Sequence, residues 1–183
     1  MSEAISFLPQ WRADARVLVL GSSPGVASLN AQQYYAHPRN AFWPVMAELC
    51  GFSAELPYEQ RVAALKASGV ALWDVIGRCF RPGSLDSSIR GDSIEPNDLA
   101  ELVARLPQLR LIVCNGATSY KLLHRHWGDL VERLQGRVEV LRLPSTSPAH
   151  ASLSPAQKVQ QWRIVGEYLA AGPDGRVAQS SRP

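Results

Sequence analysis

Several segments of this chain place polar or aromatic side chains directly after an apolar run, where a ligand could reach them. The loop Gly21–Gly25 follows the apolar residues 17–20 and is built from glycine, serine and proline. Such a turn exposes backbone N–H groups and allows close approach to the main chain. Residues 34–43 then combine aromatic rings, a histidine, an arginine and an amide. Rings stack on a planar base, arginine binds phosphate, and an amide pairs with the edge of a heterocycle, so these residue types favour a nucleotide or base as ligand.

Short apolar runs alternate with helical patterns along the whole chain. The runs that predict strands cover residues 17–20, 70–76, 109–114 and 138–143. The spacing of apolar side chains predicts helices over residues 41–50, 59–68, 97–106, 117–127 and 155–170. Near-continuous apolar strands between helices are typical of a parallel sheet that is covered on both faces. We therefore expect an α/β fold, a three-layer α/β/α sandwich with a central four-stranded parallel sheet.

The length of 183 residues predicts a single domain, over residues 1–172, and the polar end at 173–183 predicts a flexible tail. The cysteines Cys50, Cys79 and Cys114 form no CxxC pair and have no histidine at metal-ligand spacing. We interpret them as reduced thiols of a cytoplasmic protein that holds no metal. The chain has no signal-peptide pattern, and no apolar run approaches the ~18 residues of a membrane span, so we expect no contact with a membrane.

The basic residues are mostly arginine, sixteen against three lysines, at a net charge of +3. A general preference for arginine codons would explain this ratio, but placement favours a role. Arg78, Arg81 and Arg90 lie in one predicted loop, and Arg39 lies in the aromatic segment. We expect Arg39 and some of the others to line a basic groove, because arginine forks suit phosphate groups. The lysines lie in predicted helices, away from the loops.

The loops that follow the predicted strands should meet, because parallel strands share a carboxyl end. These loops cover residues 21–40, 77–96, 115–116 and 144–154. We expect Asn40, Asn115 and Ser23 to share one pocket at this edge of the sheet, with His37 and His150 nearby.

These motifs resemble those of the uracil-DNA glycosylase superfamily over most of the chain. The loop Gly21–Gly25 is similar to the family's Gly-x-x-Pro-Gly turn, and His37–Trp43 resembles the His-Pro-x-Asn-x-Phe-Trp run of its mismatch-specific branch. Asn115 stands where the family has the Asn that ends the third strand, and Leu143–Pro148 resembles the final Ser/Pro loop that presses on DNA. With the Arg-Pro-Gly-Ser-Leu-Asp run at 81–86, the motifs are most similar to the hypoxanthine-DNA glycosylase branch.

The resemblance implies a monofunctional DNA glycosylase that hydrolyses the N-glycosidic bond of a flipped deaminated base, hypoxanthine first, in base excision repair. Uracil is the alternative substrate. A non-catalytic module that binds damaged bases or DNA is the alternative to an enzyme. A nucleotide enzyme with a phosphate cradle is disfavoured, because both common phosphate-binding glycine motifs are absent. The expected partner is DNA containing deaminated bases, bound by a monomer without a cofactor.

The resemblance also assigns roles to residues. Asn40, Asn115 and Ser23 are the candidate catalytic residues. Ser23 replaces the water-positioning Asn of the mismatch-specific branch, and Ser145 replaces the His of the uracil-specific branch. The base contacts are expected from Asn115, Asn40, Tyr35 and Phe42. The DNA contacts are expected from Arg39, Arg81, Ser145, Ser147, His150 and Leu153, with the apolar Leu153 entering the base stack.

Each candidate also has a purely structural explanation. Asn40 would serve as the N-cap of the helix that follows it, worth ~1 kcal/mol. Asn115 would belong to a strand-to-helix turn, and the Ser23 hydroxyl would bond its own backbone. His37 would be a solvated side chain. Asp74, at a predicted strand end, would hold the neighbouring loop through backbone N–H groups rather than act as a base.

Overall fold

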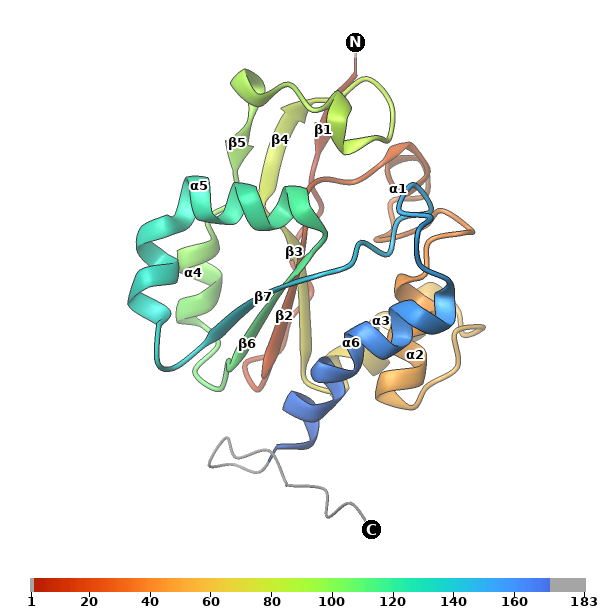
Figure 1. Ribbon diagram of the computed structural model, residues 1–183, viewed down its shortest axis with the longest axis vertical. Coiled ribbons are helices and arrows are strands. Elements are labelled where there is room, and N and C mark those ends of the chain that lie inside the picture. The colour runs from red at the N-terminus through yellow and green to blue at the C-terminus, as the bar shows by residue number, and fades with distance from the viewer. Residues whose placement is uncertain (1, 172–183) are drawn as a thin grey trace.

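Four parallel strands form the centre of the molecule, with helices on both faces (Figure 1). The computed structural model describes residues 2–171. The strands are β2 (Val17–Gly21), β3 (Val70–Asp74), β6 (Leu111–Asn115) and β7 (Glu139–Leu143), in the order β3-β2-β6-β7. All neighbouring pairs are parallel. The predicted three-layer sandwich with a four-stranded parallel sheet is confirmed.

Alternate residues of the central strands pack into two separate cores. In β2, Leu18 and Leu20 face the core under one helical layer, whereas Val17 and Val19 face the other. All four side chains are fully buried, and burying each stabilises the fold by about 1.5–3 kcal/mol. The first layer holds α4 (Leu99–Ala104) and α5 (Ala117–Leu134), and the second holds α2 (Phe42–Cys50), α3 (Tyr58–Ala67) and α6 (Pro155–Ala170) (Figure 1).

The predicted strand over residues 70–76 is divided in the structure. β3 ends at Asp74, and the N–H groups of Val75 and Ile76 donate to the carbonyls of Gly21 and Ser22 at 2.9 and 3.0 Å, just beyond the end of the parallel pairing. The chain continues in an antiparallel sheet that the sequence interpretation missed. That sheet contains β1 (Glu3–Ile5), β4 (Ile76–Phe80) and β5 (Glu95–Pro96), in the order β1-β4-β5. The segment 77–96, predicted as a loop, therefore contains strand residues and two 3₁₀ turns, Asp86–Ser88 and Gly91–Ser93.

The helices differ from their predicted bounds mainly at two places. The helix predicted over 117–127 continues to Leu134, with a kink at Trp127 (φ −130°, ψ 30°). The short helix α1 (Val26–Ala31) was not predicted, because six residues are too few to show a helical period. No helix within residues 2–171 is long and apolar enough to cross a membrane. The tail predicted over 173–183 lies outside the described residues.

Candidate active site

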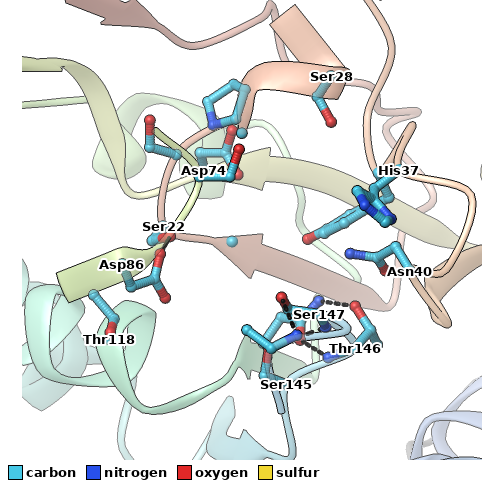
Figure 2. A pocket seen from close by; sticks show the side chains of 18 of the residues that line it. Ser22, Ser28, His37, Asn40, Asp74, Asp86, Thr118, Ser145, Thr146 and Ser147 are labelled. Carbon is cyan, nitrogen blue, oxygen red and sulfur yellow. Dashed lines mark hydrogen bonds between the residues drawn. The ribbon is translucent and has the colours of Figure 1, made fainter. Parts of the chain in front are cut away.

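The carboxyl end of the parallel sheet opens into a pocket of about 360 Å³ (Figure 2). This volume lies in the range of small-molecule sites. Asn40, Asn115 and Ser23 all line the pocket, as do His37 and His150. The prediction that these side chains share one pocket is confirmed. Figure 2 shows Asp74, Asn40 and the Ser145–Ser147 segment on different walls around a central space.

Asn115 is held in one orientation by Thr146. The Thr146 N–H donates to Oδ1 of Asn115, and Nδ2 of Asn115 donates to Oγ1 of Thr146, both at 2.9 Å (Figure 2). A backbone N–H can only donate, so the amide oxygen must face it. Asn115 is 8% exposed and Thr146 is fully buried. One lone pair of Oδ1 and one Nδ2 proton remain for a ligand in the pocket.

Asn40 has both a structural contact and a place in the pocket. Its Oδ1 accepts a hydrogen bond from the N–H of Phe42 at 3.0 Å, which forms a turn just before α2. The N-cap of α2 is Ala41, so the alternative of Asn40 as the N-cap is wrong. No side chain or carbonyl in residues 2–171 accepts a hydrogen bond from its Nδ2, and Figure 2 shows this nitrogen turned toward the central space. The next residue, Ala41, donates its N–H to the carbonyl of Thr146 at 2.9 Å. Thr146 therefore contacts both segments that carry an amide.

Of the two aromatic residues expected at the base, Tyr35 lines the pocket and Phe42 does not. The Phe42 ring is fully buried and does not line the pocket, because the helical spacing of α2 turns it into the core. The Tyr35 ring lies on it, with the centroids 4.1 Å apart and an interplanar angle of 26°. The predicted contact between Phe42 and the base is therefore wrong. Tyr35 has a φ of +54°, a strained conformation for a side chain of this size and one that is common at functional sites.

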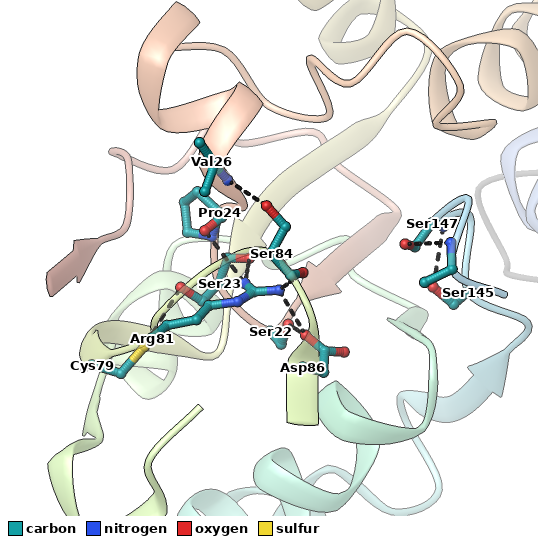
Figure 3. A network of polar contacts seen from close by, with 11 residues as sticks. Ser22, Ser23, Pro24, Val26, Cys79, Arg81, Ser84, Asp86, Ser145 and Ser147 are labelled. Carbon is teal, nitrogen blue, oxygen red and sulfur yellow. Dashed lines mark hydrogen bonds and ion pairs between the residues drawn. The ribbon is translucent and has the colours of Figure 1, made fainter. Parts of the chain in front are cut away.

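Arg81 is buried and does not reach the rim, contrary to its predicted contact with DNA. Its guanidinium donates to the Ser23 carbonyl at 2.7 Å, to the Ser84 carbonyl and to Oδ1 of Asp86 at 3.3 Å (Figure 3). The side chain is 4% exposed. These contacts tie the segment 81–86 to the loop Gly21–Gly25. Sequence alone could not distinguish this role, since an arginine fork satisfies buried carbonyls as well as phosphates.

Of the other arginines predicted at the rim, Arg78 and Arg90 pair with acidic side chains, whereas Arg39 does not in the described part of the chain. Arg78 pairs with Glu3 at 3.4 Å and Glu95 at 3.8 Å, and neither Arg78 nor Arg90 lines the pocket. Arg90 lies 3.4 Å from an aspartate two residues away. Arg39 is exposed beside the pocket residue Asn40, and no acidic side chain in residues 2–171 pairs with it.

The final Ser/Pro loop is shaped by its own serines. Ser145 and Ser147 line the pocket, and each hydroxyl accepts the N–H of the residue two positions later at 3.2 Å. Leu153, the predicted wedge, is half-buried and does not line the pocket. An exposed leucine that was not predicted, Leu85, lines the pocket mouth instead and is 56% exposed.

Two side chains of helix α6 donate hydrogen bonds to carbonyls of the final Ser/Pro loop. Lys158 donates from Nζ to the Ser147 carbonyl at 3.1 Å, and Trp162 donates from Nε1 to the Pro144 carbonyl at 2.9 Å. The expectation that every lysine lies away from the loops is therefore wrong for Lys158. Burial lowers the pKa of Lys158, but the residue does not line the pocket. Its contact supports the loop.

Asp74 is a pocket residue whose role the sequence left open. It is 4% exposed, and its Oδ2 accepts a hydrogen bond from the Ser6 hydroxyl at 3.2 Å. No backbone N–H in residues 2–171 donates to its carboxylate, so it does not hold a loop in the predicted way. Burial raises the pKa of Asp74 to about 7, against the opposing effects of Ser6 and Arg81. No group of three His, Cys, Asp or Glu side chains in the described part of the chain could hold a metal ion.

Two known proteins are similar to this chain in sequence. A protein of Methanosarcina acetivorans named hypoxanthine DNA glycosylase is 35% identical over 155 residues, 83% of this chain and 90% of that protein. A protein of the same name from Methanosarcina barkeri is 35% identical over 114 residues, 62% of this chain and 71% of that protein.

A solved structure is also similar to this chain. A solution NMR structure from Methanosarcina acetivorans, provisionally named a uracil DNA glycosylase, has a TM-score of 0.74 and 32% identity and covers 92% of this chain and 99% of that one. The model of the uracil DNA glycosylase superfamily matches residues 8–166, which include every strand of the parallel sheet and every residue of the pocket except Phe7. This chain therefore belongs to the uracil DNA glycosylase superfamily.

Proposed function

We propose that this protein is a monofunctional DNA glycosylase that hydrolyses the bond between deoxyribose and a flipped hypoxanthine base, as a step of base excision repair. The observation that carries the proposal is the amide of Asn115, which Thr146 holds in one orientation inside the pocket. The names of two relatives, each 35% identical, support hypoxanthine as the base.

The fixed amide suits the edge of hypoxanthine. Hypoxanthine presents N1–H as a donor beside O6 as an acceptor, and Asn115 offers the complementary lone pair and proton. Adenine presents the opposite arrangement, so it would need the amide to be reversed. The reversed amide would set two donors, Nδ2 and the Thr146 N–H, against each other. Loss of such a paired buried contact costs about 1–3 kcal/mol, which supports discrimination against adenine.

Uracil is the second candidate base. It presents N3–H beside O4, the same donor and acceptor order as hypoxanthine, so Asn115 alone does not distinguish the two. The family to which the chain belongs is named for uracil. The size of the pocket and the flat ring of Tyr35 would decide between a purine and a pyrimidine.

The target base must leave the stack to reach this pocket, at a cost of a few kcal/mol. Leu85 is our candidate for the side chain that fills the gap. It is exposed at the mouth, and both neighbouring residues are anchored: the Ser84 hydroxyl accepts the Val26 N–H at 2.9 Å, and Asp86 accepts from the Ser22 hydroxyl at 2.7 Å (Figure 3). An apolar side chain on a rigid support can insert without losing much conformational entropy.

Contacts with the DNA backbone would come from residues in or beside the pocket. Arg39 is exposed beside the pocket residue Asn40, and His150 and the segment Ser145–Ser147 line the pocket. Phosphate contacts supply most of the affinity for DNA and make it depend on salt.

The deciding experiment is a cleavage assay on single- and double-stranded oligonucleotides that carry hypoxanthine, uracil, xanthine or an intact mismatch. We expect strand breaks at hypoxanthine only after hot alkali, because a monofunctional enzyme leaves an intact abasic site. Borohydride should trap no covalent adduct, since Lys158 does not line the pocket. Preferred excision of uracil would favour the second candidate, and binding without excision of any base would favour a non-catalytic module.

A further inference from the structure

Gly21, at the end of β2, has no side chain, so two polar side chains of the pocket can approach its backbone closely. A Cβ atom at this position would lie 2.5 Å from Oδ1 of Asp74 and 3.0 Å from the hydroxyl of Tyr35. Both polar atoms therefore lie close together beside the Gly21 backbone, and both residues line the pocket. No residue in the described part of the chain donates a hydrogen bond to Oδ1 of Asp74, whose other oxygen is held by Ser6.

The Tyr35 hydroxyl is the second unusual group. It is buried, and it has no hydrogen-bond partner in residues 2–171. A buried polar group without a partner costs about 1–3 kcal/mol, and such groups most often bind an ordered water or serve in catalysis. Burial, followed by the charge of Asp74, raises the pKa of Tyr35 against the lowering effect of the nearby Asn115 side chain, so the hydroxyl keeps its proton and can donate it to a ligand.

We propose that Asp74 Oδ1 and the Tyr35 hydroxyl together hold the water molecule that attacks the sugar, and that Asp74 accepts its proton. This inference rests on the proposed glycosylase function. The water oxygen forms a bond to C1′ while the C1′–N bond breaks, and the electron pair of that bond leaves with the base. The proton of the water passes to Asp74, which later returns it to solvent, and the departing base takes a proton from solvent.

Ser23, the candidate from the first motif, is less suited to this step. Its hydroxyl lies 3.7 Å from Sγ of Cys79, which donates to it, and its carbonyl is held by Arg81 (Figure 3). A hydroxyl is also a much weaker proton acceptor than a carboxylate. Asp74 has one oxygen oriented by Ser6 and the other uncovered, which is the arrangement a general base requires.

The charged and polar groups around Asp74 determine the pH range in which it can accept a proton. Arg81 and Ser6 favour the carboxylate, whereas burial and the nearby Asp86 favour the neutral acid. Tyr34 and Tyr35 lie close enough for the charge of Asp74 to raise their own pKa values. The result is a carboxyl group with a pKa of about 7, close to the value that suits a general base at neutral pH.

The test is the single-turnover rate of base excision from a hypoxanthine-containing duplex, measured from about pH 5 to about pH 9. For the wild type we expect the rate to rise through about pH 7. Asp74→Asn should lower the rate about 10²- to 10⁴-fold and remove this rise. Asp98→Asn is the matched control, because Asp98 caps α4 away from the pocket, and its profile should equal that of the wild type.

Two further variants separate catalysis from folding. Ser6→Ala removes the hydrogen bond that favours the carboxylate, so the rise in rate should move to higher pH, a shift that a purely structural role of Asp74 would not produce. Ser23→Ala should lower the rate less than Asp74→Asn does. If Asp74→Asn excises at the wild-type rate with an unchanged profile, the assignment of Asp74 is overturned and the glycosylase function stands. If the wild type excises no deaminated base, the proposed function falls, and this step with it.

Discussion

Asn115 and Thr146 form a reciprocal pair of hydrogen bonds, each 2.9 Å long, across 31 residues of sequence. The pair joins the end of β6 to the final Ser/Pro loop, and it fixes which end of the amide faces which partner. Because the Thr146 carbonyl also accepts the N–H of Ala41, this buried threonine connects the two amide-bearing segments of the pocket.

Thr146→Val should weaken base discrimination. The valine keeps the backbone N–H but removes the Oγ1 acceptor, so the Nδ2 group of Asn115 loses its partner and only the backbone N–H still orients the amide. We expect hypoxanthine excision to fall about tenfold, equivalent to ~1.4 kcal/mol, with a smaller preference for hypoxanthine over adenine. Single-turnover rates on the two bases measure this. Thr146→Ser, which keeps the hydroxyl, should behave like the wild type, and equal loss in both variants would contradict the argument.

Two substitutions of Asn40 should separate its hydrogen bond with the Phe42 N–H from its role in the pocket. Asn40→Asp keeps the oxygen that accepts the Phe42 N–H but removes the Nδ2 donor, so we expect near-normal stability and a rate lower by ~10². Asn40→Ala should lose both the Phe42 hydrogen bond and the Nδ2 donor, and its free energy of unfolding should fall by about 1 kcal/mol. Urea unfolding and single-turnover excision provide the two measurements. If Asn40→Asp excises the base at the wild-type rate, the Asn40 side chain has only a structural role.

Leu85→Ala should reduce excision from duplex DNA far more than from single strands, because only a duplex has a stack to fill. Leu8 is the matched control, since it is 81% exposed and does not line the pocket. The ratio of duplex to single-strand rates should fall about tenfold for Leu85→Ala and stay constant for Leu8→Ala. A fall in this ratio for Leu153→Ala alone would restore the wedge to the residue first expected from the sequence.

Substitution of Arg39 should change the salt dependence of DNA binding, whereas substitution of Arg81 should change the stability of the fold. Arg39→Ala should lower the slope of log Kobs against log salt concentration by about 1, because one phosphate contact is lost. Arg81→Gln should instead lower the melting temperature, because the Ser23 and Ser84 carbonyls lose a charged donor. Arg78→Ala, away from the pocket, is the control for the salt slope. An unchanged slope for Arg39→Ala would exclude Arg39 from the DNA contact.

Asp74→Asn should stabilise the protein at alkaline pH. The folded-state pKa of about 7 lies above the ordinary value of 3.8, so the stability that the neutral acid supplies is lost as the pH rises between these values. The neutral asparagine avoids this loss, which is on the order of a few kcal/mol. Its melting temperature should exceed that of the wild type by an amount that grows up to about pH 7 and is then constant. A pH-independent difference would show that Asp74 is not a buried, titrating carboxyl group.

The fold class and three residues of the pocket, Asn40, Asn115 and Ser23, could be predicted from the sequence. The apolar runs at 17–20 and 109–114 are long enough to predict buried parallel strands, and parallel strands deliver their following loops to one edge. For this reason Asn40, Asn115 and Ser23 could be placed together without coordinates. The single-domain organisation, the monomeric state and the cytoplasmic location remain predictions.

The contacts of the polar side chains could not be predicted from the sequence. Arg81 and Arg39 are equally charged and equally close to motifs, yet one is buried against carbonyls and the other is exposed, because burial depends on neighbours that are distant in sequence. Two further features depend on contacts between separate loops in the same way. They are the pairing of Thr146 with Asn115 and the approach of Asp74 and Tyr35 to each other beside Gly21. Local periodicity reports which face of an element is apolar, and it carries no information on which polar atoms meet across the end of a sheet.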